Sequence, residues 1–208
     1  MLTTLKQKTD PSRAAVLVVD MQNDFCHENG IIARQGRNMA FKKAMAPRLA
    51  RFLDTARRNR VPVIFIRQVN IRQSLSEVAM EQKRRTQPKA GGLICAEGSW
   101  GAEYYMVSPK PGEAVVTKHR YSAFNGTDLD LILRSMKVRS IILTGVATNA
   151  CVETTARDGF MNDYYVVLLS DCTATSTVED QEATLRNIRT YFGVVVDSKE
   201  VIACWTKR

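Results

Sequence analysis

The chain has 208 residues and a net charge of +9 at pH 7, a length that suits one globular domain with a full core. Hydrophobic residues make up 45% of it and charged residues 25%, which excludes a disordered chain. No apolar run approaches the roughly 20 residues that span a bilayer, and residues 1–13 lack an apolar signal core, so we expect neither a membrane protein nor a secreted one.

The cysteines and basic residues narrow the class further. Five scattered cysteines without CxxC spacing predict free thiols in a reducing cytoplasm, not a disulfide framework or a zinc site. Basic residues gather at 48–60 and 83–89 without aromatic interleaving, so we expect no nucleic-acid partner. Two explanations for the positive charge remain: these residues lie on solvent-exposed helix faces, or their electrostatic field attracts an anionic substrate.

The first half of the chain reads as two strand–helix units. The apolar run at 14–19 ends in Asp20, as a central parallel strand would, and 1–13 forms an extension before it. Apolar residues at helical spacing predict a helix over 38–60, kinked or split at Pro47. A second strand is expected at 61–69. The long connection at 72–101 contains a short helix at 74–85 and predicts a lid or pocket wall.

The second half continues the alternation. Strands are expected at 114–117, 139–144, 165–170 and 194–196, and helices at 128–137, 152–161 and 178–192. Strands alternating with helices predict a three-layer α/β/α fold around a doubly wound, mainly parallel, six-stranded sheet. Residues 14–208 would form this single domain.

Three residues with useful chemistry follow strand ends in this arrangement. Asp20, Lys118 and Cys151 would meet at the carboxyl edge of the sheet, where open α/β sheets bind ligands. A helix N-terminus and a lysine favour a thiolate, and an aspartate can accept its proton. The set suits acyl transfer through a thioester. Taken singly, however, Cys151 fits a buried hydrophobe, Asp20 a capping residue and Lys118 a solvated cation.

The local sequences point to a family. Residues 18–25, VVDMQNDF, resemble the opening signature of the isochorismatase-like cysteine hydrolases. Residues 118–124, KHRYSAF, followed by GTDL at 126–129, resemble that family's lysine segment, and 145–153, GVATNACVE, its nucleophile loop. The resemblance extends over roughly residues 14–196.

The resemblance implies roles for these residues. Asp20 would be the general base and acid, Lys118 its charged partner and Cys151 the nucleophile. A cis peptide between Val146 and Ala147 is expected, with the amides of Ala147 and Cys151 as the oxyanion hole. Isochorismatases proper lack the cysteine, so its presence favours hydrolysis of a C–N bond.

The resemblance also bears on cofactors and substrate. Nicotinamidases carry a metal site with two histidines beyond the second strand, whereas residues 67–73 read RQVNIRQ here, so we expect neither metal nor cofactor. The segments around Trp100 and Tyr121 are most similar to ureidoacrylate amidohydrolases and N-carbamoyl amidases. A small-molecule amide substrate and a homo-oligomer, a dimer or tetramer, are therefore expected. The predicted pocket walls are Gln22, Phe25, Asn70, Trp100, Tyr121 and Phe124, with Arg67 or Arg120 available for a substrate carboxylate.

Other classes remain open on sequence grounds. Cys151 and Arg157 match the C-x5-R spacing of cysteine phosphatases, but the loop between them has no glycine and contains Glu153. A catalytically inactive basic scaffold of the same fold is another reading, because fold does not fix function. A redox-active thiol is a third, although Cys151 has no resolving partner at CxxC spacing.

Overall fold

The computed structural model describes residues 1–86 and 92–206. Within these residues, six strands form one sheet in the order β3-β2-β1-β4-β5-β6, and every neighbouring pair is parallel. The strands are β1 (Ala14–Val19), β2 (Val63–Gln68), β3 (Ala114–Lys118), β4 (Ser140–Val146), β5 (Tyr165–Ala174) and β6 (Gly193–Val196). The predicted doubly wound α/β architecture is confirmed, and the sheet is entirely parallel.

The central strand β1 explains why the sheet forms from these residues. All six of its side chains are fully buried, because helices cover both faces of a parallel sheet. Val16 and Val18 point into one core, and Ala15, Leu17 and Val19 point into the other. The chain turns from β1 to β2 on one side, and β4 lies on the other side of β1. The switch point of the topology therefore lies between β1 and β4, where ligands bind in such sheets.

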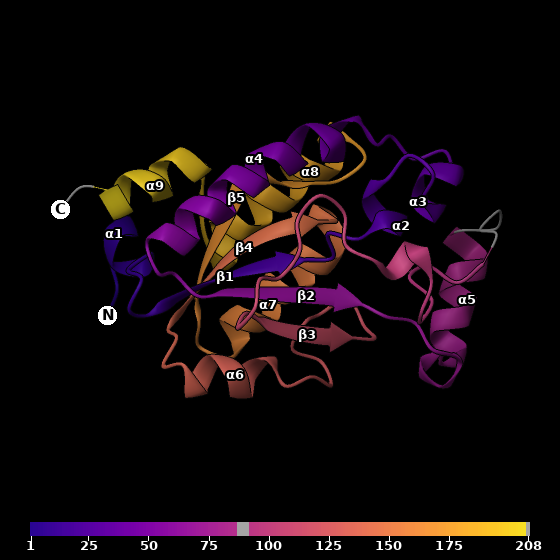
Figure 1. Cartoon of the computed structure of the whole chain (residues 1–208), viewed down its shortest axis with the longest axis horizontal. Coiled ribbons are helices and arrows are strands. Elements are labelled where there is room, and N and C mark those ends of the chain that lie inside the picture. The colour runs from indigo at the N-terminus through magenta and orange to yellow at the C-terminus, as the bar shows by residue number, and fades with distance from the viewer. Residues whose placement is uncertain (87–91, 207–208) are drawn as a thin grey trace.

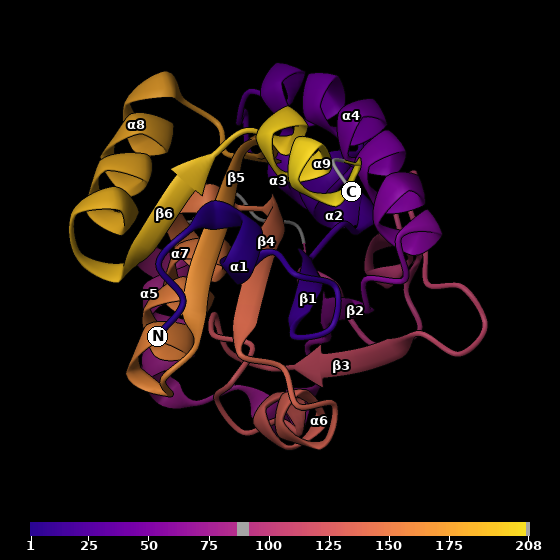
Figure 2. The same ribbon diagram turned by 90° about the vertical axis from the view of Figure 1, so that its left-hand side faces the viewer.

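Helices form the two outer layers (Figures 1 and 2). On one face lie α4 (Ala40–Arg58) and α9 (Ser198–Thr206). On the other lie α6 (Leu129–Ser135), α7 (Glu153–Met161) and α8 (Val178–Asn187). Two π-helical turns, η3 (Thr148–Val152) and η4 (Ile188–Phe192), adjoin α7 and α8.

Short elements gather at the carboxyl ends of the strands. Figure 1 shows the arrowheads of β1, β2 and β3 pointing toward α2 (Asn23–Cys26), α3 (Ile31–Arg34) and α5 (Glu77–Thr86). The 3-10 turns η1 (Arg72–Ser74) and η2 (Trp100–Ala102) lie in the same connection. The predicted connection at 72–101 is thus largely structured, and the part of it at 87–91, including the end of the second basic stretch, lies outside the described residues.

Two features differ from the sequence-based expectation. Helix α4 runs unbroken through Pro47, so the helix is not split there, while the alternative of a kink at the proline stays a prediction. Its buried face continues on both sides of the proline, from Met45 to Leu49 and Phe52, and packs into one core. Helix α9 was not expected; its Trp205 is buried and donates from Nε1 to the carbonyl of Thr9 at 2.6 Å.

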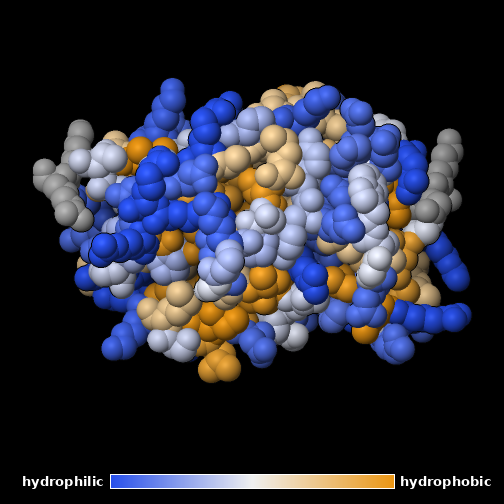
Figure 3. Space-filling view, viewed as in Figure 1, coloured by the Kyte–Doolittle hydropathy of each residue, from blue (hydrophilic) through white to orange (hydrophobic). Residues whose placement is uncertain are grey.

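The N-terminal segment lies against the domain. Its short helix α1 (Leu5–Lys8) contacts α9, and both helices lie at the end of the sheet away from α5 (Figure 1). The division between an extension at 1–13 and a domain at 14–208 stays a prediction. In residues 1–86 and 92–206, no helix has the length and hydropathy needed to cross a membrane. Figure 3 shows a mostly hydrophilic face with apolar residues gathered over α6, where Leu131 is 69% exposed.

Candidate active site

Asp20, Lys118 and Cys151 meet at the switch point of the sheet. They follow β1, end β3 and follow β4, respectively. Lys118 Nζ lies 2.8 Å from Asp20 Oδ2 and 3.3 Å from Cys151 Sγ. The side chains of Lys118 and Asp20 are 0% and 1% exposed, and Cys151 is 5% exposed. The structure therefore brings together three residues that are far apart in the sequence.

Asp20 is held by its backbone in an uncommon conformation. Its φ is +50°, a left-handed value that aspartate tolerates better than most residues. Its amide donates to the carbonyl of Ile66 at 2.9 Å, and its carbonyl accepts from the Gln22 amide at 2.7 Å. The contact with Lys118 is an ion pair, and hydrogen bonding to the Asp20 carboxylate also raises the pKa of the Cys151 thiol. Lone pairs of this carboxylate are thus available to a proton.

The loop that carries Cys151 depends on close packing of β4 against β1. Gly145 has a φ of +99°, and a Cβ there would lie 2.0 Å from the carbonyl oxygen of Val19, so only glycine fits. The Val146–Ala147 peptide is cis, as expected. The carbonyl of Ala147 then accepts from the amides of Ala150 and Val152 at 3.1 and 3.2 Å. Cys151 lies in the π-helical turn that precedes α7.

Burial dominates the electrostatics of the thiol. It raises the pKa of Cys151 to about 12; the Lys118 ammonium opposes this shift, and the Asp20 carboxylate adds to it. The sequence led us to expect a favoured thiolate, but desolvation outweighs the lysine, so the resting side chain is a thiol. Burial alone would lower the pKa of Lys118, yet the adjacent Asp20 carboxylate holds that pKa above its ordinary value. The lysine is therefore a permanent cation.

Gln68 is a member of this cluster that the sequence did not suggest. Its Oε1 accepts from Lys118 Nζ at 2.8 Å, and its Nε2 donates to Asn70 Oδ1 at 3.3 Å. The carbonyl of Arg120 accepts from the same ammonium at 3.1 Å. Gln68 pairs with Lys118 in the β2–β3 register. One feature of the sequence could have pointed to Gln68: it is a polar residue on the same strand face as Ile64 and Ile66, one position before the predicted end of the strand.

Polar residues of the opening motif hold the connection between β2 and β3. Gln22 Nε2 donates to the carbonyls of Gln68 and Ala102, and its Oε1 accepts from the Gln68 amide. Asp24 accepts from the amides of Ile31 and Cys95 at 3.0 and 2.7 Å. These contacts fix one wall of the site. The amide group of Gln22 is occupied by backbone groups, and its predicted part in substrate binding stays a prediction.

The other polar or half-exposed residues predicted to line the pocket differ in burial. Asn70 is buried and donates to the carbonyl of Ile94 at 2.6 Å. Trp100 is 45% exposed and lies edge-on to His27, whereas Tyr121 is 52% exposed. Burial raises the pKa of the Tyr121 phenol, and the predicted place of these three residues in the pocket stays a prediction.

Two predicted aromatic residues pack mainly into cores. Phe25 lies against the α4 core and against a small cluster of Ile31, Ile94 and Cys95. Phe124 stacks on Tyr164 with ring centroids 5.8 Å apart. Their assignment as pocket walls stays a prediction.

Three arginines considered from the sequence do not face the thiol. Arg67 donates to Thr117 Oγ1, and it alternates with Ile66 and Gln68, so it points to the opposite face of the sheet. Arg120 donates to the carbonyls of Ser74 and His119. Arg157 pairs with Glu153 and lies over the Phe192 ring at 4.6 Å. This position disfavours the C-x5-R phosphatase alternative.

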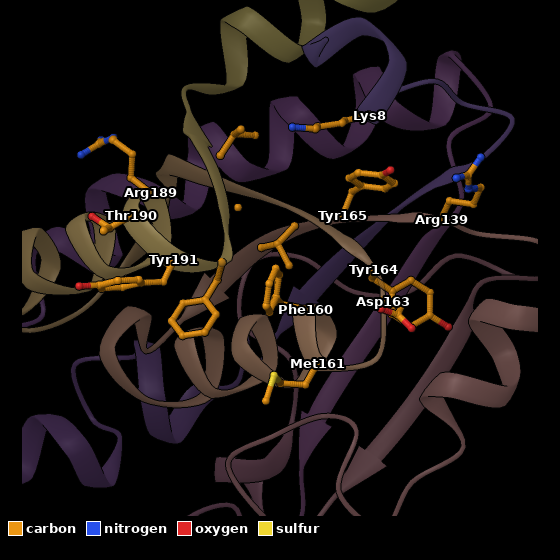
Figure 4. Close-up of a pocket in the computed structure, with 14 residues that line it drawn as sticks. Lys8, Arg139, Phe160, Met161, Asp163, Tyr164, Tyr165, Arg189, Thr190 and Tyr191 are labelled. Carbon is orange, nitrogen blue, oxygen red and sulfur yellow. The ribbon is translucent and has the colours of Figure 1, made fainter. Parts of the chain in front are cut away.

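A separate groove of about 750 Å³ opens at the amino-terminal ends of β5 and β6, away from the carboxyl ends where the cluster lies (Figure 4). Tyr165 and Gly193, the first residues of β5 and β6, lie in it together with Phe160 and Tyr191. Lys8 and Arg139 both lie 5.9 Å from the Tyr165 ring. None of the three clustered residues lines this groove.

The fold and the cluster define a doubly wound α/β protein with a buried cysteine, lysine and aspartate at its switch point. A family model described as the isochorismatase domain matches residues 14–200. The chain belongs to this family and is a hydrolase, which confirms the resemblance seen in the three motifs.

Solved structures of related proteins agree. A cysteine hydrolase from Pseudomonas syringae pv. phaseolicola 1448A is 30% identical, with 94% of this chain and 93% of that chain covered and a TM-score of 0.81. N-carbamoylsarcosine amidase from Thermoplasma acidophilum is 25% identical, with 89% and 96% covered and a TM-score of 0.72. Pyrazinamidase of Pyrococcus horikoshii, solved in complex with zinc, is 25% identical, with 89% and 99% covered and a TM-score of 0.74. These neighbours support action on C–N amide bonds.

The residues of this chain do not fit a zinc site of that kind. In the described ranges, no three His, Cys, Asp or Glu side chains lie close enough together to hold a metal ion. Beyond β2, Asn70 is engaged with Ile94, and His119 Nδ1 lies 2.6 Å from the carbonyl of Val69. No chemical step is therefore assigned to a metal.

Proposed function

We propose that this protein is a metal-independent cysteine amidohydrolase that cleaves the C–N bond of a small amide or ureido compound through a thioester on Cys151. One observation carries the proposal: a single buried ammonium, Lys118 Nζ, contacts both the Asp20 carboxylate and the Cys151 sulfur. A thiol, a proton acceptor and a fixed cation are the groups that acyl transfer requires.

In the first step, the thiol proton passes to Asp20 as the sulfur attacks the carbonyl carbon. Because burial raises the pKa of Cys151 to about 12, the thiolate is a minor species at neutral pH. Proton transfer must therefore accompany the attack, and Asp20 is the nearby base. The Lys118 ammonium stabilises the sulfur as it becomes negative.

The developing oxyanion needs hydrogen-bond donors. We assign this role to the amides of Ala147 and Cys151, at the two ends of the loop that begins with the cis peptide. The carbonyl of Ala147 is turned toward Ala150 and Val152, which orders the loop before substrate binds. Protonated Asp20 then gives its proton to the leaving amine, and the C–N bond breaks.

In the second step, water hydrolyses the thioester. Asp20 takes a proton from the water as the water oxygen attacks the thioester carbon. The C–S bond then breaks, and the Cys151 sulfur takes that proton back from Asp20. The products are a carboxylic acid, or a carbamic acid from a ureido substrate, together with the amine or ammonia. The N-carbamoylsarcosine amidase among the structural neighbours supports the ureido alternative.

The test is turnover of a panel of primary amides and ureido acids, followed by ammonia release. During turnover, acid quenching and intact-mass measurement should detect an acyl adduct, and tryptic peptides should assign it to Cys151. Hydroxylamine should trap the thioester as a hydroxamate.

Matched variants decide the mechanism. Cys151→Ala should abolish turnover and the adduct, whereas Cys204→Ala, which removes a free thiol on α9, should leave both unchanged. Wild-type activity in Cys151→Ala would exclude the thioester.

A homo-oligomer remains part of the proposal, and exposed Leu131, Phe160 and Tyr191 are apolar groups available for its interface.

A further inference from the structure

The groove at the amino-terminal ends of β5 and β6 has the size of a small-molecule site (Figure 4). Its volume of about 750 Å³ lies within the roughly 300–1,000 Å³ that ligand pockets occupy. Tyr165 and Val166 at the start of β5 line it, and so do Gly193 and Val194 at the start of β6. The catalytic candidates follow the other ends of the strands, so the groove needs a separate explanation.

Two cations converge on one tyrosine ring in the groove. Lys8 Nζ, on α1, and the guanidinium of Arg139, just before β4, each lie 5.9 Å from the centre of the Tyr165 ring. The Tyr165 hydroxyl accepts from the amide of Leu2 at 3.0 Å, which ties the N-terminal segment to the same ring. Cation–π contacts hold a cation in place without neutralising it. Two positive charges are therefore fixed at this part of the groove.

The groove contains more positive than negative charge. Arg189 is a third cation that lines it, and Asp163 is its carboxylate. Among the residues that the structure describes, neither Lys8 nor Arg139 nor Arg189 takes part in an ion pair. Cations that line a concave surface without paired anions raise the local concentration of negative ligands. The charge of the groove thus favours an anion.

The other part of the groove is aromatic. Phe160, on α7, and Tyr191, in η4, have ring centroids 5.7 and 6.1 Å from that of Phe192. Phe160 is nevertheless 44% exposed and Tyr191 67% exposed. Exposed aromatic rings present flat apolar surfaces on which a planar group can stack. This part of the groove therefore suits an aromatic ring system.

The two parts together define the chemistry of one ligand. We propose that the groove binds a planar aromatic anion, such as a nucleotide, with its ring system against Phe160 and Tyr191 and its phosphate or carboxylate beside Lys8 and Arg139. None of the three clustered residues of the candidate active site lines the groove. The inference is therefore independent of the proposed amidohydrolase function.

A second copy of the chain is another occupant that the exposed rings would allow. In an isologous contact, the same surface patch of both subunits meets itself. The cations of the groove would then face the same cations, and such a juxtaposition of like charges is unfavourable. Charge therefore favours an anionic ligand over a second copy.

Calorimetric titration with matched ligands tests the inference. AMP and indole-3-acetate are aromatic anions, adenosine and indole-3-ethanol are their neutral counterparts, and ribose 5-phosphate is an anion without a base. At least one aromatic anion should bind with a Kd about 10-fold or more below that of its neutral counterpart, because charge-assisted hydrogen bonds are the stronger ones. If AMP is the ligand bound, its Kd should also lie below that of ribose 5-phosphate. A preference for AMP or for indole-3-acetate assigns the anion as phosphate or carboxylate.

Three variants separate the two parts of the groove. Arg139→Gln should raise the Kd of the anion about 10-fold or more and leave that of its neutral counterpart within about twofold. Tyr191→Ala should raise the Kd of both by about 5-fold or more, because a stacking surface is lost. Arg51→Gln removes an exposed cation of α4 outside the groove, so it matches the charge change of Arg139→Gln and should bind as wild type. Cys151→Ala should also bind as wild type.

The replaced arginine and tyrosine side chains are exposed, so the melting temperatures should stay at the wild-type value. Several results would overturn the proposal: no binding of either anion, equal affinity for anions and their neutral counterparts, or binding that is lost in Cys151→Ala but kept in Arg139→Gln. Sedimentation of the same variants tests the second copy. Dissociation of an oligomer by Tyr191→Ala, with unchanged ligand affinity, would assign the groove to an interface and reject the ligand.

Discussion

Replacing Asp20 by Asn should affect catalysis and stability by different mechanisms. The variant removes the proton acceptor and leaves the Lys118 ammonium buried at 0% exposure, without the carboxylate now 2.8 Å away. Loss of a positioned general base costs about 10²- to 10⁴-fold in rate. Loss of one partner of a buried ion pair costs about 3–5 kcal/mol of unfolding free energy. The pKa of Lys118 should fall, since Asp20 is a main cause of its elevation.

The two effects are measured in parallel. Ammonia release from the best compound of the panel gives kcat/KM, and urea denaturation followed by circular dichroism gives the unfolding free energy. Activity is assayed at a temperature where denaturation curves show the variant more than 90% folded. The loss of rate then reports chemistry rather than the folded fraction.

A double variant separates the effects. Asp20→Asn combined with Lys118→Met removes both buried charges and should recover most of the lost stability, because no unpaired ion remains. It should recover no activity. Wild-type kcat/KM in Asp20→Asn would refute the assignment of Asp20 as the proton acceptor. An unchanged unfolding free energy in Asp20→Asn would refute the claim that the Asp20 carboxylate stabilises the buried Lys118 ammonium.

Three further predictions concern the loop, the amide contact and pH. Gly145→Ala should lower the unfolding free energy by more than about 2 kcal/mol, because the added Cβ would lie 2.0 Å from a backbone oxygen. Gly112→Ala is the control: its φ is +88° and the space around it is open, so it should cost about 1 kcal/mol in the same denaturation assay. Gln68→Met should lower kcat by about 10-fold or more through loss of the 2.8 Å contact to Lys118, and a shifted pH–rate profile would distinguish positioning from a purely structural role. Because burial raises the pKa of Cys151 to about 12, its neutral thiol stabilises the fold fully below about pH 8.5, and this contribution is lost as pH rises toward 12. Cys151→Ala should therefore reduce the fall of unfolding free energy between pH 9 and 11 by about 1.4 kcal/mol per pH unit, and an unchanged slope would contradict the raised pKa.

The sequence predicted the sheet because each strand carries its own signal. Continuous apolar runs and strand ends marked by polar residues located all six strands within a few residues. The meeting of Asp20, Lys118 and Cys151 followed from topology, since parallel strands end at one edge. Helix α9 was missed because it is short and begins two residues after β6 ends.

Long-range contacts could not be predicted from the same patterns. One example is Gln22, whose side chain donates to the carbonyls of Gln68 and Ala102. These bonds depend on how the connection after β2 folds back over the site, which the local sequence does not reveal. The protonation state of Cys151 depends on complete burial, which outweighs the adjacent lysine. Sequence identifies the charges in this site, but the balance between desolvation and charge requires the packed structure.

The cluster and its substrate keep a constant net charge during the proposed reaction. At rest, the Asp20 carboxylate and Lys118 ammonium sum to zero beside a neutral thiol. As the proton passes to Asp20, the carboxylate becomes neutral and its negative charge moves through the attacking sulfur to the carbonyl oxygen of the substrate, so the sum over the cluster and the substrate is again zero. Because a net charge is costly in an enclosed site, a lysine that contacts both oxygen and sulfur allows the negative charge to move without a change in total. The Gln68 and Arg120 oxygens hold the ammonium in place, so its position need not change when its partner does.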